Sequence, residues 1–266
     1  MSPLLSVQKC SFTYEEGDFT LRDVSLSTDG RELLGIVGPN GSGKSTLMRL
    51  MSGYYQPRDG EVWLQGRCLS DLGSREAARQ LAFLPQRSPP AFEYNVRDVV
   101  AMGRYPYTGP FGFPEEEDRR AVRRALEETH AAQFANRPFN SLSGGEKQQV
   151  LLASVLAQEP KLMLLDEPAA SLDLHHTSEL LDLLWSLSRN GPGVVVVTHD
   201  VNTAALFCDR LVLLSEGRQV RSGPPGDVMD EKLLSRVYGT ELEVEKNPVT
   251  DTPMVVVPGR RAHGTH

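Results

Sequence analysis

A glycine-rich loop followed by a lysine and two hydroxyl residues is the segment whose residue types most plainly suggest chemistry. It matches the pattern G-x-x-x-x-G-K-[ST] in full and reads Gly38-Pro39-Asn40-Gly41-Ser42-Gly43-Lys44-Ser45. Glycines let a backbone wrap closely around phosphate groups, and a helix N-terminus adds partial positive charge. We expect Lys44 to reach the β- and γ-phosphates, Ser45 to coordinate Mg²⁺ and Thr46 to contact the α-phosphate. A glycine-rich turn that matches by chance is the alternative, which the flanking strand and helix patterns disfavour.

A second chemical feature is a pair of acids at the end of an apolar run, Leu162-Met163-Leu164-Leu165-Asp166-Glu167. Buried adjacent carboxylates are costly unless a cation compensates their charge. We expect Asp166 to hold Mg²⁺ directly or through water. Glu167 should point to the opposite face of the strand end, where it can serve as the general base for an attacking water. A solvated strand end is the alternative for an isolated Asp-Glu pair.

Short apolar strands separated by helical segments must position these residues. Residues 33–37, 162–165, 194–198 and 211–214 are apolar runs of strand length, and helical patterns follow near Lys44 and over residues 177–188 and 201–208. This alternation predicts an α/β fold with a parallel sheet covered on both faces. Residues 4–37 alternate apolar and polar in short pieces, which predicts mostly antiparallel strands ahead of the loop. Further strands are expected at residues 60–65 and 81–84.

The composition changes between the two chemical features. Residues 88–114 are rich in proline and aromatic side chains, and residues 115–135 are strongly charged with helical spacing of their apolar positions, namely Ala121, Val122, Ala125, Leu126 and Thr129. We predict an inserted helical subdomain over residues 88–157. The ATP-binding core, with its β subdomain, then comprises residues 1–87 and 158–240, and residues 241–266 form a C-terminal extension and tail.

The bulk properties limit the class of protein. The chain has 266 residues, a formal net charge of −7, 39% hydrophobic and 24% charged residues, all ordinary for a globular protein. No apolar run approaches the roughly 20 residues that cross a bilayer, and the N-terminus lacks a signal-peptide pattern. The negative charge argues against nucleic acid as a partner. Three scattered cysteines, Cys10, Cys68 and Cys208, predict no disulfide framework and a reducing compartment.

The deciding motif is Leu142-Ser143-Gly144-Gly145-Glu146, which opens a helical segment. Together with the loop and the acid pair, it resembles the signature of ABC ATPases, over most of the chain. A serine and two glycines before a helix form a second anion-binding N-terminus. One chain cannot direct both cradles at the same phosphates across an inserted subdomain, whereas a head-to-tail homodimer can. The resemblance therefore implies ATP as the nucleotide, with this signature completing the partner's site. A plain helix cap is the alternative for most isolated Ser-Gly-Gly tripeptides.

Four weaker positions match the family in its order. The resemblance implies that Tyr14 stacks on adenine, that Gln86 touches Mg²⁺ and the attacking water, that Asp173 lies in a loop crossing the dimer interface, and that His199 contacts the γ-phosphate. Taken singly, a tyrosine in a strand or a histidine at a strand end is more often structural. The chain departs from the family where Lys147 and Gln149 replace frequent arginines, which leaves the phosphate-capping positions unchanged.

Four further segments look like the branch that serves iron-siderophore, heme and cobalamin importers, namely residues 81–86, 96–106, 171–176 and 247–250. This resemblance implies a membrane permease as partner, a periplasmic or lipid-anchored substrate-binding protein behind it, and a peripheral place at the cytoplasmic face of the inner membrane. We expect the aromatic, proline-rich stretch from Arg104 to Phe113 to be exposed and to dock near the permease. His175 and His176 are adjacent on a helix, so we interpret them as surface or interface residues rather than as a metal site.

Other functions are disfavoured by what the chain contains. ABC ATPases of DNA repair or chromosome cohesion carry a long coiled coil, and those of translation carry two cassettes; this sequence has neither. Another importer or an exporter stays possible, although the four importer-like segments and the absence of a fused membrane domain disfavour an exporter. A kinase with the same phosphate loop would have no use for the signature.

Overall fold

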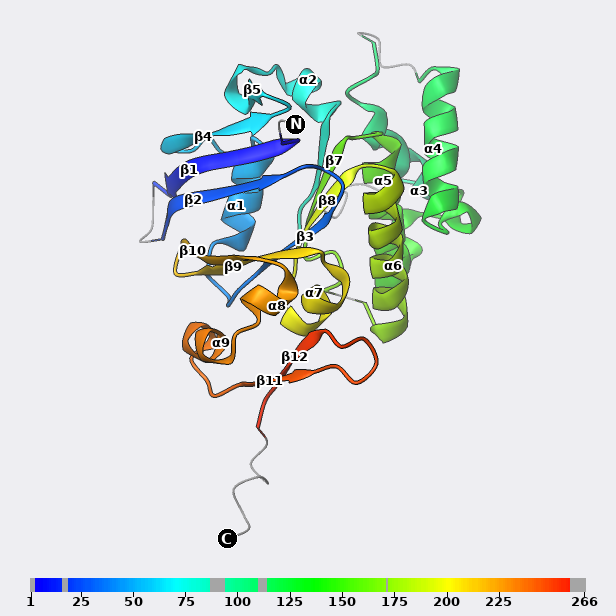
Figure 1. The fold of residues 1–266 in the computed structure, drawn as a ribbon. Helices are drawn as coiled ribbons and strands as arrows, with labels where there is room; N and C mark the ends of the chain where they lie inside the picture. The colour runs from blue at the N-terminus through cyan, green and yellow to red at the C-terminus, as the bar shows by residue number, and fades with distance from the viewer. Residues whose placement is uncertain (1–2, 16–18, 87–93, 110–113, 171, 259–266) are drawn as a thin grey trace.

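The computed structural model describes residues 3–15, 19–86, 94–109, 114–170 and 172–258. Its centre is a six-stranded sheet in the order β10-β9-β3-β8-β7-β6 (Figure 1). Five of these strands are parallel, and β10 pairs antiparallel with β9. Their bounds are β3 Leu33–Val37, β6 Leu81–Leu84, β7 Leu162–Asp166, β8 Gly193–Val197, β9 Arg210–Ser215 and β10 Arg218–Gly223.

The apolar strands β3, β7 and β8 are buried along their whole length because both faces of the sheet are covered. Alternate side chains enter two separate cores: Leu162 and Leu164 pack on one face, and Met163 and Leu165 on the other. The α/β class and the parallel strands expected from the sequence are confirmed.

One face carries α1 (Lys44–Met51) and the N-terminal antiparallel sheet, with strand order β2-β1-β4-β5. Its strands are β1 Leu5–Thr13, β2 Thr20–Thr28, β4 Asp59–Leu64 and β5 Arg67–Cys68, followed by the short helices η1 Leu69–Asp71 and α2 Ser74–Ala78. The short elements β5, η1 and α2 were not predicted.

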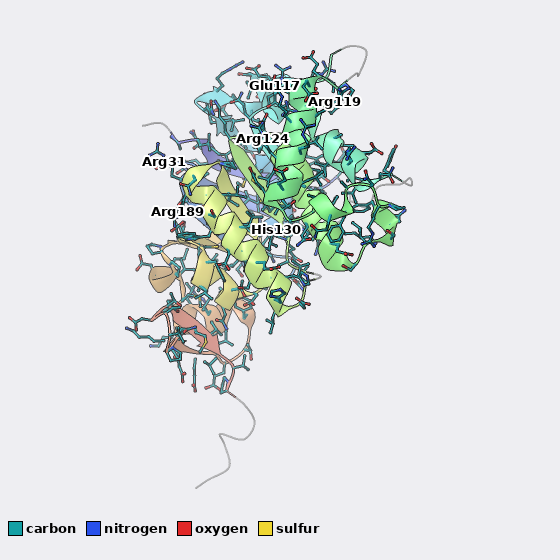
Figure 2. All side chains as sticks on the ribbon, turned by 90° about the vertical axis from the view of Figure 1, so that its right-hand side faces the viewer. Arg31, Glu117, Arg119, Arg124, His130 and Arg189 are labelled. Carbon is teal, nitrogen blue, oxygen red and sulfur yellow. The ribbon has the colours of Figure 1, made fainter. Side chains whose placement is uncertain are left out.

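The opposite face carries α6 (Leu174–Asn190), α7 (Val201–Phe207) and a group of helices that lies between β6 and β7 in sequence. This group comprises α3 Val96–Ala101, η2 Met102–Arg104, α4 Glu116–Glu128, η3 Ala132–Phe134, η4 Phe139–Ser141 and α5 Gly144–Ala157. All five predicted apolar positions of the charged segment are buried. Its helix ends at Glu128, earlier than the spacing suggested, and His130 has a left-handed φ of 54° that turns the chain away. Figure 2 shows His130 beyond the end of α4, whose exposed side presents Arg119 and Arg124.

A buried arginine holds this helical group together and corrects one expectation. Arg104, expected to be exposed, is only 3% accessible. Its Nε donates to Asp118 (2.8 Å) and its Nη1 donates to the Ala157 carbonyl (2.9 Å) and to Glu159 (2.7 Å). The Tyr107 ring lies 4.0 Å from its guanidinium carbon. A buried guanidinium requires such partners. Here α4 supplies Asp118, and the end of α5 with the residues just after it supplies Ala157 and Glu159.

The C-terminal part contains α8 (Pro225–Val228), α9 (Glu231–Tyr238) and a hairpin of β11 (Glu243–Lys246) and β12 (Pro253–Val256). The hairpin turn is shaped by Asn247, whose Oδ1 accepts from the N–H groups of Val249 and Thr250. Among the described residues, no helix combines the length and the apolar character needed to cross a bilayer.

Candidate nucleotide-binding and catalytic site

The glycine-rich loop connects β3 to α1, and its glycines are required by close contacts. Gly38 has a φ of 149°, and a Cβ atom there would lie 2.1 Å from the Leu214 carbonyl oxygen. Gly43 has a φ of 104°, and a Cβ atom there would lie 2.8 Å from the Phe19 ring. Both positions combine a conformation that L side chains rarely adopt with no room for one. The remaining loop positions Asn40, Gly41 and Ser42 lie between them as the sequence predicts.

Lys44 is buried at the start of α1, where its ammonium donates to the carbonyl oxygens of Gly38 (2.8 Å) and Pro39 (2.9 Å). Burial lowers the pKa of Lys44, and the negative charges of Glu167 and Asp166 oppose that shift. The lysine, the loop and both acids of the second motif therefore lie in one place, although more than 120 residues separate them in the sequence.

Asp166 is buried at the end of β7, and burial raises its pKa, opposed by a hydrogen bond from Ser45. Its Oδ1 atom is enclosed and has no hydrogen-bond partner within the part of the chain that the structure describes, and the same holds for Ser42 Oγ. A serine hydroxyl beside a carboxylate with a free oxygen is a donor set that suits Mg²⁺, which prefers oxygen ligands. Ser45 and Asp166 therefore fit the metal predicted from the sequence.

The backbone of Glu167, the expected base, adopts a strained conformation that a hydrogen bond holds in place. Its φ is 52°, a conformation that costs a non-glycine residue on the order of 1–3 kcal/mol. Its N–H donates to the Val197 carbonyl (3.0 Å) across to β8, which anchors the turn. The side chain is 16% exposed. The carboxylate reaches the residues that follow β6 and β8.

Two predicted catalytic side chains reach the Glu167 carboxylate. Gln86 Nε2, just after β6, donates to Glu167 Oε2 at 2.6 Å. His199 Nδ1, just after β8, lies 3.9 Å from the same oxygen, and its side chain is 61% exposed. The carboxyl ends of β6, β7 and β8 thus bring Gln86, Glu167 and His199 together, at the edge where parallel sheets form their ligand sites.

Tyr14 contacts the first turn of α1. Its hydroxyl is 2.9 Å from Thr46 Oγ1, and its ring meets the rings of Phe12 and Tyr55 edge-on, with centroid distances of 5.0 Å and 5.8 Å. The predicted adenine contact and the predicted α-phosphate contact are therefore hydrogen-bonded to each other.

The signature residues form a self-contained helix cap. Ser143 Oγ accepts from the Glu146 N–H (3.3 Å), and the Glu146 carboxylate accepts from the Ser143 N–H (2.7 Å). Leu142 is buried beneath this capping box, while Ser143 and Gly144 are exposed and Gly145 is partly buried. Among the described residues, no hydrogen bond between turns, loops or side chains joins residues 142–146 to residues 38–46. The helix cap that was the alternative interpretation of Ser143-Gly144-Gly145 is therefore present, and Ser143 is still exposed.

Asp173 caps α6: its Oδ1 accepts from the His176 backbone N–H (2.9 Å) and lies 2.8 Å from His176 Nδ1. The hydrogen bond from the His176 backbone lowers the pKa of Asp173, with help from the His176 side chain. His176 also lies behind Gly145 of the signature, while His175 stays exposed beside Glu179. No sequence pattern predicts this link, through His176, between Asp173 and the signature. Ser171 lies outside the described residues.

Comparison with protein families decides what this arrangement is. A family model described as ABC transporter matches residues 21–170, a span that includes the phosphate loop, the signature and both acids. The chain belongs to the ABC transporter family.

Relatives of the cassette are similar over most of its length. Hemin import ATP-binding protein HmuV of Rhodococcus jostii (strain RHA1) is 43% identical over 237 residues, which are 89% of this chain and 80% of that protein. Ferric enterobactin transport ATP-binding protein FepC of Escherichia coli (strain K12) is 40% identical over 231 residues, 86% of this chain and 85% of that protein. YvrA of Bacillus subtilis (strain 168), an uncharacterized ABC transporter ATP-binding protein, is 41% identical over 239 residues; the match covers 89% of this chain and 54% of that longer relative.

Solved structures agree with this assignment. A structure described as a metal-chelate type ABC transporter in an inward-facing conformation superposes with a TM-score of 0.86 at 27% identity, covering 98% of this chain and 100% of that one. The MJ0796 ATP-binding cassette, solved as a dimer bound to ADP and Pi, superposes with a TM-score of 0.72 at 30% identity, covering 83% and 98%. The cassette is therefore an ATPase of this family, and the predicted resemblance to the siderophore and heme importer branch is confirmed.

Proposed function

We propose that the cassette is the ATP-hydrolysing subunit of an importer that takes up heme or an iron-siderophore through a membrane permease. The observation that carries the proposal is the hydrogen bond of 2.6 Å from Gln86 to Glu167, beside His199 and in reach of the charge of Lys44. This contact supports Glu167 as the base beside the glycine-rich loop.

In this function Glu167 accepts a proton from the water that attacks the γ-phosphate, and Gln86 and His199 orient the reacting groups around it. Lys44 and the loop N–H groups neutralise the developing negative charge.

Ser45, Asp166 and Gln86 would hold Mg²⁺, which supplies charge neutralisation at the β- and γ-phosphates when bound. Tyr14 supports the adenine, and Thr46 reaches the α-phosphate.

The site is completed by a second copy arranged head to tail. Ser143 and Gly145 of one chain cap the γ-phosphate held by the other, and Asp173 lies at the same interface. The exposed Ser143 hydroxyl supports this arrangement because its oxygen is engaged as an acceptor while its proton stays free to donate. The dimeric MJ0796 cassette supports it by similarity.

The relatives support the cargo class. One is named for hemin import and another for ferric enterobactin transport, so heme and ferric siderophores rank ahead of cobalamin. On this proposal the cassette sits at the cytoplasmic face of the cell membrane, and a substrate-binding protein delivers the cargo. The permease docks on the surface that exposes Met102 (47%) and Tyr105 (69%). Residues 110–113 of the expected docking stretch lie outside the described residues.

The test is co-purification with the permease, followed by ATPase assays in proteoliposomes with binding protein loaded with hemin, ferric enterobactin or cobalamin. Stimulation of ATPase and uptake by hemin or ferric enterobactin is expected. Stimulation by cobalamin alone, or by none of the three, would overturn the cargo assignment. Tyr105→Asp should reduce co-purification. Tyr54→Asp serves as the matched control, because Tyr54 is a similarly exposed tyrosine that follows α1.

A further inference from the structure

The C-terminal hairpin is attached to α7 by a single side chain that makes two hydrogen bonds. Asn202 Nδ2 donates to the Val255 carbonyl (2.9 Å), and the Val255 N–H donates to Asn202 Oδ1 (2.7 Å). Figure 1 shows β12 lying directly against α7. The amide thus engages both backbone groups of one residue that is 53 positions away.

The Asn202 side chain makes the two hydrogen bonds that a neighbouring strand would make with Val255. Val255 is paired with Val244 of β11, and its own N–H and C=O both point outward to Asn202. In an antiparallel pair such outward groups belong to a residue that exchanges no hydrogen bond with its partner. An asparagine in the first turn of a helix more often faces solvent or bonds locally. Here it satisfies the open edge of β12 instead.

The helix that Asn202 belongs to begins immediately after His199. Asp200 Oδ1 caps α7 by accepting from the N–H groups of Asn202 (3.0 Å) and Thr203 (3.1 Å), and the Asp200 N–H donates to Thr198 Oγ1 (3.1 Å). His199 is therefore held between the end of β8 and the first turn of α7. Any shift of α7 moves one side of this short connection.

Packing on the same helix strengthens the attachment. Val201 of α7, Val244 of β11 and Val255 of β12 are all partly buried against the main core, as is Tyr238 at the end of α9. Burial raises the pKa of Tyr238, and the negative charge of Asp200 raises it further, so Tyr238 is near enough to the cap of α7 to feel its charge. The β12 strand thus contacts the helix that follows His199 through hydrogen bonds as well as through apolar packing.

We propose that the β11–β12 hairpin braces the connection carrying His199 through Asn202, which makes Asn202 a positioning residue for ATP hydrolysis. The proposal rests on the proposed role of His199 at the γ-phosphate. It assigns a purpose to the C-terminal extension and to the Asn247-Pro248-Val249-Thr250 segment, which forms the turn of the brace.

The test compares Asn202→Ala and Asn202→Asp with the parent chain in steady-state ATPase assays. Both variants should lower kcat, by up to about tenfold when both bonds are lost, with KM for ATP unchanged. Asn202→Asp guards against misfolding because an acid is favourable in the first turn of a helix, while it cannot donate to the Val255 carbonyl. Lys246→Ala, which removes an exposed ion pair with Asp251 on the same hairpin, is the control and should leave kcat unchanged.

A double-mutant cycle with His199→Ala separates positioning from general damage. If Asn202 acts through His199, the Asn202 substitutions should have little further effect once the histidine is gone. Wild-type kcat in both Asn202 variants, or the same fold loss with and without His199, would overturn the brace. Full activity of His199→Ala would overturn the proposed role of His199, and with it the proposed role of the hairpin. If His199→Ala is defective while both Asn202 variants are fully active, only the role of the hairpin is overturned.

Discussion

Two helix N-termini carry the motifs that we propose bind phosphate in this cassette, and they are built in opposite ways. The α1 terminus begins at Gly43, which provides no side-chain cap, so its N–H groups are open to a ligand. The α5 terminus begins at Ser143, which closes a capping box with Glu146. The first helix leaves its end without a side-chain cap, whereas the second caps its own end and presents a hydroxyl.

The same contrast extends to the surroundings of each terminus. Beside α1, Asp166 is buried with a raised pKa, Ser42 Oγ has no partner within the described residues, and Glu167 has a strained φ. Beside α5, the capping hydrogen bonds from Ser143 lower the pKa of Glu146, and Arg137 lies 3.5 Å from its carboxylate. The surroundings of α1, which we call the catalytic half, thus retain a buried carboxylate and a strained backbone. The surroundings of α5, the signature half, satisfy their polar groups within the chain.

The largest expected effect tests the catalytic half. Glu167→Gln keeps the size of the side chain and removes its basicity, so ATP turnover should fall by about 10²- to 10⁴-fold. ATP affinity should persist, because the cradle is formed by other residues. Turnover measured by phosphate release and affinity measured with a fluorescent ATP analogue give the two values. Hydrolysis at the wild-type rate would show that Glu167 is not the base.

A second prediction tests whether the two halves meet between chains. Ser143→Arg places a bulky cation at the signature and should inactivate the homodimer, as should Glu167→Gln. Mixing the two inactive chains should restore part of the activity, because one site of the mixed dimer combines an intact base with an intact signature from the other chain. A site completed within one chain predicts no recovery. Mixing each variant with itself is the control.

The contrast also explains what could be predicted from the sequence. The loop, the acid pair and the signature are contiguous motifs with local physical causes, and the apolar runs of β3, β7 and β8 predict their place on a parallel sheet. The proximity of Gln86 and His199 to Glu167 could be expected only from the family resemblance. Their functional roles stay predictions.

Other features depend on contacts between distant segments and left no local signal. Arg104 lies in an aromatic, proline-rich stretch that suggested exposure, yet it is buried and hydrogen-bonded to Asp118 and Glu159. The β11–β12 hairpin was not predicted because its strands are short and half exposed, and because Asn202 supplies the missing edge contacts. In both cases the contact is made by a polar side chain from a distant segment, whereas sequence prediction depends on the local spacing of apolar residues.

The smallest expected effect concerns stability. The folded-state pKa of Asp166 is raised by burial, so its ionisation disfavours folding as pH rises from the unfolded pKa through the folded one. Asp166→Asn should therefore raise the free energy of unfolding near neutral pH, by up to about 1 kcal/mol, with the gain shrinking toward acid where both states are protonated. Denaturant unfolding without Mg²⁺ across pH measures this. Asp173→Asn is the matched opposite, because the folded-state pKa of Asp173 is lowered by the His176 hydrogen bond: its carboxylate contributes stability above the unfolded pKa that is lost as pH falls. A gain for Asp166→Asn that grows toward acid, or gains of the same sign for both variants, would contradict the idea that the catalytic half alone retains an unfavourable charge.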